Sequence, residues 1–169
     1  MNTLEAIKAR RSIREYTSKP VPPEVLKELL TAAMYAPSAG NAQPWHFVVL
    51  TQREALNRAA EVHPHAQMAK EAPLAIIVCV DLDLEKYPGN WVADCSAATQ
   101  NLLLAATEKG LGSVWCGIYP NEPRVEAFRK AYNLPPSVVP LSLNVIGYPA
   151  EQKPAPERFR QDRIHENRW

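Results

Sequence analysis

The sequence has few cysteines, almost no net charge and no long apolar run, and each absence excludes a class of protein. Among 169 residues, only Cys79, Cys95 and Cys116 are cysteines, and none forms a CxxC pair. We therefore expect reduced thiols in a cytosolic protein. A net charge of +1 disfavours a nucleic-acid-binding protein. No stretch approaches the roughly 20 apolar residues of a membrane span, and early charges make a signal peptide unexpected.

Several common catalytic and nucleotide-binding motifs are also absent. The sequence contains no GxxxxGK[ST] phosphate-binding loop, no GxGxxG fingerprint and no GxSxG nucleophile elbow. His63 and His65 form an HxH pair, but no further ligands complete the set of three or four that a metal site needs. We therefore predict that both histidines are exposed to solvent, and we expect neither a metal nor a catalytic side chain.

Proline, by contrast, is abundant, and its sixteen copies mostly separate periodic apolar segments. The pattern predicts helices over residues 2–11, 22–36, 53–62, 91–110 and 122–133, and strands over 46–51, 74–80, 113–119 and 141–149. Because helices and strands intermix, the class is α/β or α+β in three layers. With no repeat and no linker, we expect one domain over residues 1–169.

Two segments raise the question of a second subunit. Residues 150–169 form a tail with five basic and four acidic side chains and little apolar content. The tail either wraps a partner subunit or is a frayed terminus, and Ile164 and Trp169 favour packing against something. The helix over 91–110 is rich in alanine and leucine, and it either packs on a partner or is buried within one subunit.

Positive charge is concentrated in "ARRSIREY", residues 9–16, where Arg10, Arg11 and Arg14 surround Ser12. On a helix, Arg10 and Arg14 would lie one turn apart on the same face. Guanidinium forks and a hydroxyl suit a phosphate, because a fork binds two oxygens at once. The alternative is that these cations compensate a helix C-terminus. Three arginines around a serine favour the anion site.

The loop "APSAGNAQPW", residues 36–45, carries Ser38, Asn41 and Gln43 between two prolines. Amide side chains both donate and accept, so this loop could hydrogen-bond the edge of a flat heterocycle. Taken alone, its serine, glycine and asparagine are better explained by turn chemistry.

Together, these segments resemble the FMN-dependent nitroreductase family. "ARRSIREY" resembles its RxSxR signature, and "APSAGNAQPW" resembles its PSxxNxQPW loop. Residues 94–115 are similar to its central helix with the following GLG turn, and residues 146–169 to its final strand and C-terminal arm. The resemblance covers essentially the whole chain, and it is to the short members, which lack the inserted helices of the larger enzymes.

The resemblance implies an α+β fold with three α/β/α layers and a central mixed sheet, assembled as a domain-swapped homodimer. The arm, about residues 150–169, would extend over the partner subunit. One FMN would be tightly bound at each of two sites in the subunit interface.

The resemblance also assigns cofactor-binding roles to residues 10–14. Arg10 and Ser12 would bind the FMN phosphate, and Arg11 would lie along the phosphate or ribityl chain. Arg14 would approach the ribityl chain and the N1/O2 side of the ring.

Three further groups are implied by the same resemblance. The loop residues from the other subunit are Pro37, Ser38, Asn41 and Gln43. The strand that passes the flavin, with its backbone groups near the ring, comprises Val114, Trp115, Cys116 and Gly117. In the arm, Lys153 or Arg158 would complete the phosphate site.

The implied activity is that of an NAD(P)H-dependent oxidoreductase, with ping-pong hydride transfer through flavin N5 to nitroaromatics, quinones or similar electron-poor acceptors. NAD(P)H would be a transient co-substrate. Residues 63–72 and 82–91 would form pocket walls, in which Tyr87, Trp91 and Tyr119 either stack on a substrate or are simply packed. The alternatives are a flavin-binding protein without this turnover, a relative with dehalogenase or flavin-fragmenting chemistry, and a module that binds another anion.

Overall fold

Every helix and strand expected from the apolar pattern is present in the computed structural model, which describes residues 1–169. The helices are α1 (Thr3–Ala9), α2 (Pro23–Met34), α3 (Arg53–Val62), α4 (Trp91–Glu108) and α5 (Glu122–Ala131). The strands are β1 (Trp45–Leu50), β2 (Leu74–Asp81), β3 (Gly112–Gly117) and β4 (Val138–Gly147). None of the helices combines the length and the apolar character needed to cross a bilayer.

The four strands form one sheet in the order β1-β2-β4-β3, and every neighbouring pair is antiparallel. The expectation of a mixed sheet is therefore wrong for this chain. The one parallel pairing is an isolated bridge between Ser12 and Ser113. Apolar runs show that a strand is buried but carry no signal of its direction, which is why the sequence did not reveal this arrangement.

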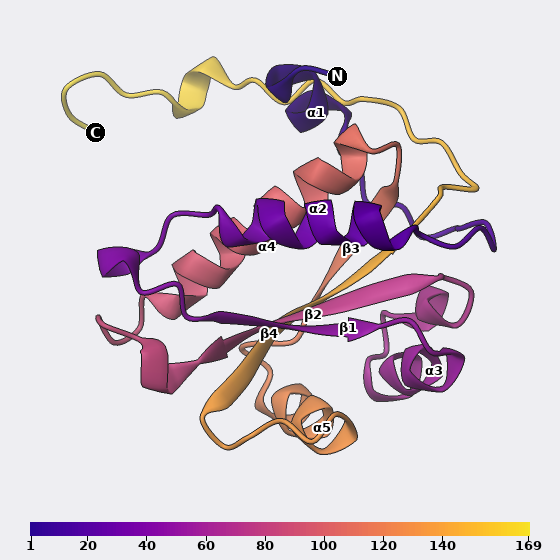
Figure 1. The fold of residues 1–169 in the computed structure, drawn as a ribbon. Helices are drawn as coiled ribbons and strands as arrows, with labels where there is room; N and C mark the ends of the chain where they lie inside the picture. Colours follow the sequence, from indigo (N-terminus) through magenta and orange to yellow (C-terminus); the bar gives the residue numbers. More distant parts are fainter.

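Helices cover both faces of the sheet, with α2 and α4 on one side and α3 and α5 on the other (Figure 1). Successive side chains of β2 alternate between two cores, because neighbouring residues of a strand point to opposite faces. Leu74 and Ile76 join the core under α2 and α4, whereas Ile77 faces α3 and α5. The three-layer α/β/α architecture is thereby confirmed.

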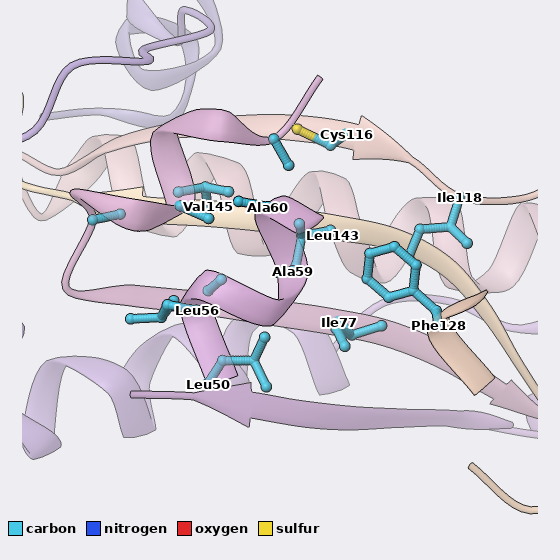
Figure 2. Packing of buried hydrophobic residues seen from close by; sticks show 14 of the residues in the cluster. Leu50, Leu56, Ala59, Ala60, Ile77, Cys116, Ile118, Phe128, Leu143 and Val145 are labelled. Atoms are coloured by element: carbon cyan, nitrogen blue, oxygen red, sulfur yellow. The ribbon is translucent and has the colours of Figure 1, made fainter. Parts of the chain in front are cut away.

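Phe128 of α5 anchors the core under α3 and α5. Its ring lies close to Ile77 and Ile118 (Figure 2), and all three side chains are fully buried. Burying a phenylalanine side chain stabilises a fold by about 1.5–3 kcal/mol. This packing holds α5 against the sheet and thereby fixes the residues of its first turn beside the end of β3.

Helix α1 begins as expected but ends earlier. The Asn2 side chain accepts from the Glu5 N–H, and Glu5 accepts from the Asn2 N–H, which completes a capping box. The helix ends at Ala9, and Arg10 already has extended backbone angles, with φ −54° and ψ 125°. The expectation that Arg10 and Arg14 lie one helical turn apart is therefore wrong.

The segment after α1 is extended because it runs against the start of β3. The Ile13 N–H donates to the Ser113 carbonyl at 3.0 Å. A Cβ on Gly112 would lie 2.7 Å from the Ile13 side chain, so only glycine permits this approach. Residues 10–14, the arginine segment, are thereby placed next to β3.

The C-terminal arm, residues 150–169, begins along the arginine segment and continues past α1 (Figure 1). The Glu151 carboxylate accepts from the Arg14 N–H at 2.6 Å, and the Lys153 ammonium donates to the Ser12 carbonyl at 2.8 Å. Beyond these anchors the arm is exposed, including Phe159, Ile164 and Trp169. The arm thus packs little on its own chain, as its composition indicated.

Candidate functional site

A cavity of about 550 Å³ lies beside β3, the edge strand of the sheet. Five of the expected cofactor-binding residues line it: Arg14, Val114, Trp115, Cys116 and Gly117. The rest of its wall comes from residues 63–68, with the exception of Ala66, and from Arg124 of α5. No aspartate or glutamate lines the cavity, so its two guanidinium groups give it a positive character.

The open edge of β3 presents backbone hydrogen-bonding groups to this cavity. The Ser113 carbonyl bonds to the Ile13 N–H on the side away from β4. In an antiparallel ladder, residues alternate between bonding the neighbouring strand and pointing away from it. The backbone N–H and C=O groups of Trp115 and Gly117 therefore point away from β4, as those of Ser113 do. The Trp115 N–H and C=O and the Gly117 N–H can contact a flat ring that lies against the strand edge.

His63 holds the end of β3, and the prediction that it is exposed is wrong. Its side chain is only 1% exposed. Its Nδ1 accepts from the His65 N–H at 3.1 Å, so the ring proton lies on Nε2, which donates to the Gly117 carbonyl at 2.9 Å. Burial lowers the pKa of His63 and keeps the ring neutral. His65 is exposed, as predicted.

A second positive region lies where α1 ends. Burial lowers the pKa of Arg10, and the guanidinium groups of Arg158 and Arg11 lower it further. None of these three arginines takes part in an ion pair. Arg11 instead donates to two backbone carbonyls, those of Arg10 and Pro154. We call these three residues the arginine cluster; like charges gathered without a counter-ion are suited to binding an anion.

Of the two arm residues expected to complete this site, Arg158 contributes the charge that acts on Arg10. Lys153 instead forms an ion pair with Glu151 at 3.0 Å while donating to the Ser12 carbonyl. The arm thus brings one free guanidinium and one neutralised ammonium to the arginine segment.

The loop of residues 36–45, which we call the amide loop, has an unusual backbone. Gly40, Asn41 and Gln43 have positive φ angles of 60°, 52° and 50°. Residues other than glycine rarely adopt this region, and such strain concentrates at functional sites. A Cβ at Gly40 would lie 2.6 Å from the Tyr87 ring, so this position requires glycine for two reasons.

Three contacts stabilise the amide loop. The Ser38 hydroxyl accepts from the Gln43 N–H at 2.9 Å, and the Asp94 carboxylate accepts from the Ala39 N–H at 3.0 Å. The Lys86 ammonium donates to the Gly40 carbonyl at 2.8 Å. Asn41, Gln43 and Pro37 are nevertheless exposed, so the loop presents its amides outward in a fixed arrangement.

The amide loop and the arginine segment lie at opposite ends of the molecule, the loop at the left and the segment at the right of Figure 1. No residue of the amide loop lines the cavity. Within one chain, the expected site residues are therefore brought together in two separate places.

The aromatic candidates separate into two kinds. Trp91 is buried and packs edge-on against Tyr119, with ring centroids 4.8 Å apart, so the packed interpretation holds for this pair. Tyr87 is 57% exposed. Residues 63–68 contribute a wall of the cavity as expected, whereas no residue of 82–91 does.

Sequence reasoning missed Arg124 altogether. Its side chain lines the cavity and donates to the Gly117 carbonyl at 2.6 Å. The available signal was its position, seven residues after Gly117 in the first turn of the following helix. No group of three or more histidine, cysteine, aspartate or glutamate side chains is arranged to hold a metal.

Comparison with known proteins identifies relatives over the whole chain. The profile of the nitroreductase family matches residues 7–75 and 62–148. A protein of Methanothermobacter thermautotrophicus, provisionally named NADH dehydrogenase/NAD(P)H nitroreductase, is 53% identical over 169 residues, which are 100% of this chain and 88% of that protein. A crystal structure from Parabacteroides distasonis with the same provisional name has a TM-score of 0.95 at 42% identity, covering 100% of both chains. An FMN-dependent nitroreductase from Clostridium difficile R20291 has a TM-score of 0.91 at 28% identity, covering 98% of this chain and 99% of its own.

Proposed function

Because the chain belongs to the nitroreductase family, we propose that it is an FMN-dependent oxidoreductase that uses NAD(P)H to reduce electron-poor acceptors such as nitroaromatics or quinones. The observation that carries this proposal is an arginine cluster without a counter-ion. Two of its members lie a few residues before Arg14, which lines a cavity bounded by the open edge of β3. The relative from Clostridium difficile is named as FMN-dependent, and the archaeal relative is named for NAD(P)H.

The residues present fit such a cofactor. Arg10, Arg11 and Arg158 supply cations for a phosphate, and Ser12 lies within the same segment. The outward backbone groups of Trp115 and Gly117 match the donors and acceptors along the edge of a flavin ring. When bound, FMN would accept hydride from NAD(P)H and pass the electrons to the acceptor.

Two groups on the cavity wall have supporting roles. Arg14 places a fixed positive charge there, which favours the transfer of negative charge to a ring bound beside it. Burial raises the pKa of the Cys116 thiol to about 11, so this side chain stays protonated at neutral pH and is not a nucleophile. Reaction on the cofactor, without a catalytic side chain, agrees with this environment.

The separation of the amide loop from the cavity supports a homodimer as part of the proposal. Pro37, Ser38, Asn41 and Gln43 of one copy would complete the site of the other, and the arm would cover the partner. Exposed apolar side chains on α1 and the arm, among them Leu4, Ile7, Phe159 and Trp169, support such an interface. The chain of residues 1–169 would act as one domain with the arm as its extension.

The test is a visible spectrum of the purified protein, with and without added FMN, followed by anaerobic titration with NADH and then NADPH. We expect flavin absorbance that NAD(P)H bleaches and that a quinone or nitroaromatic restores. Flavin that does not bleach would indicate a binding protein without turnover. Absorbance lost permanently in air would indicate fragmentation of the flavin. Failure to take up FMN would overturn the proposal.

A further inference from the structure

Arg124 is a cation of the cavity that belongs to neither the arginine segment nor the arm. It lies in the first turn of α5, where the Asn121 side chain accepts from its N–H at 3.0 Å. Its guanidinium donates to the Gly117 carbonyl at 2.6 Å. Since both its backbone and its side chain are held, the guanidinium has a defined position on the cavity wall.

No carboxylate neutralises Arg124. It takes part in no ion pair, and no aspartate or glutamate lines the cavity. The guanidinium groups of Arg14 and Arg124 both act on Cys116, where they oppose the rise that burial causes in the thiol pKa. A guanidinium has five N–H donors, and the bond to Gly117 leaves the others free for a ligand.

We propose that Arg124 is a specificity-determining residue that binds a carboxylate on the acceptor, so that the enzyme prefers acidic acceptors to neutral ones of equal reducibility. The inference rests on the proposed function, because it places the acceptor in the cavity that also takes the flavin ring. Arg14 reaches the cavity from the arginine segment, whereas Arg124 reaches it from α5. A planar guanidinium fork matches the two oxygens of a carboxylate.

The test compares 4-nitrobenzoate with the neutral 4-nitrobenzamide, using the FMN-loaded protein and NADH as donor. For Arg124→Gln we expect kcat/KM for nitrobenzoate to fall about tenfold relative to nitrobenzamide, as for loss of a hydrogen bond to a charged group. Arg124→Lys keeps the charge but not the planar fork, so its preference for nitrobenzoate should lie between those of the wild type and Arg124→Gln. The matched control is Arg58→Gln, which removes an exposed arginine that pairs with Glu61 on α3.

Wild-type protein provides a check that needs no variant. Added salt should reduce the preference for nitrobenzoate, because screening weakens exposed charge interactions. For the variants, an equal fall in kcat/KM for both acceptors in Arg124→Gln would overturn the inference. Arg124 would then only support β3 through its bond to the Gly117 carbonyl. In parallel assays with NADPH as the donor, a change confined to the KM of NADPH would overturn the inference and assign Arg124 to the phosphate of that donor.

The two proposals fail in distinguishable ways. If the wild-type protein takes up no FMN, or its flavin is not bleached by NADH, the proposed function has failed. If flavin uptake and bleaching are normal in every variant and the ratio of the two acceptors does not change, only the role of Arg124 is wrong.

Discussion

The arginine segment and the amide loop are the two polar signatures of this sequence, and the fold treats them differently. The arginine segment lies against β3, beside the cavity and the start of the arm. The amide loop lies at the other end of the sheet (Figure 1). Its residues Asn41 and Gln43 are exposed to solvent. One chain therefore holds the proposed anion-binding residues apart from the amide loop, which is the arrangement expected if two copies complete each other's sites.

The two regions also differ in the energetic cost that each carries within one chain. At the arginine cluster the cost is electrostatic, because three like charges have no counter-ion. At the amide loop it is conformational, because Asn41 and Gln43 adopt left-handed backbone angles. Such features persist when surrounding contacts stabilise them, and they mark positions where function and stability conflict.

Complementation between two defective chains should have the largest effect. Arg10→Gln/Arg11→Gln and Asn41→Ala/Gln43→Ala homodimers should each lose nearly all NADH-dependent nitroreduction. A heterodimer, isolated with two different affinity tags, should contain one intact site and regain about half of the wild-type activity. Activity is measured as nitrobenzoate reduction per dimer.

The control for complementation is a heterodimer of two chains that carry the same arginine changes, which should stay inactive. If the mixed heterodimer is no more active than its parents, the amide loop does not complete the partner's site, and the contrast between the two regions loses its proposed meaning.

Removing one cation should separate binding from stability at the arginine cluster. Arg10→Gln should weaken FMN binding by about 10- to 100-fold, the effect of losing a hydrogen bond to a charged group. The melting temperature of the FMN-free protein should not fall, because the change relieves repulsion from Arg11 and Arg158. Fluorescence titration with FMN and thermal melts measure the two quantities. Arg58→Gln, a change in an arginine that is already paired, should alter neither; an unchanged FMN affinity in Arg10→Gln would remove Arg10 from the site.

At the amide loop, removing the carboxylate that holds the backbone should reduce the stability of the folded protein. Asp94→Ala leaves the Ala39 N–H without its acceptor, which should lower the free energy of unfolding by about 1–3 kcal/mol. Asp94→Asn keeps an acceptor oxygen and should cost less, all the more because the second carboxylate oxygen is buried without a partner. Urea denaturation of the FMN-free protein measures both, with Asp162→Ala in the exposed arm as control. Equal losses in the two Asp94 variants would show that the hydrogen bond to Ala39 is not what stabilises the loop.

Much of the fold could be predicted from the sequence, because helices and strands have local signals. Alternating and continuous apolar runs gave all the main elements, and Asn2 with Glu5 gave the first helix cap. What could not be predicted depends on contacts distant in sequence. Helix α1 ends before the arginines because Ile13 bonds to Ser113, a hundred residues further on, and nothing local to the segment encodes that contact.

The site shows the same limit. The arginine segment and the strand after the central helix were identified by motif, and the fold does bring Arg14 and Cys116 to one cavity. His63 was expected in solvent because an HxH pair gives no information on burial. Its environment comes from Gly117 and Phe128, which lie 54 and 65 positions away in the sequence.

Replacing His63, which lines the cavity, should have the smallest effect, a change in how the free energy of unfolding depends on pH. Burial lowers its pKa in the folded state, whereas an unfolded histidine has a pKa of about 6.5. Between these two values the unfolded chain binds more protons, so stability should fall as the pH drops from 6.5 towards the folded pKa and should be constant above about 7. His63→Gln can still donate to the Gly117 carbonyl but cannot titrate, so its unfolding free energy should vary less over this range. Because His65 is exposed, His65→Gln should keep the wild-type slope. If His65→Gln reduces the pH dependence of the unfolding free energy and His63→Gln does not, the buried imidazole of His63 does not control the acid sensitivity of the β3 edge. That edge would then be held mainly by Arg124 and the core around Phe128.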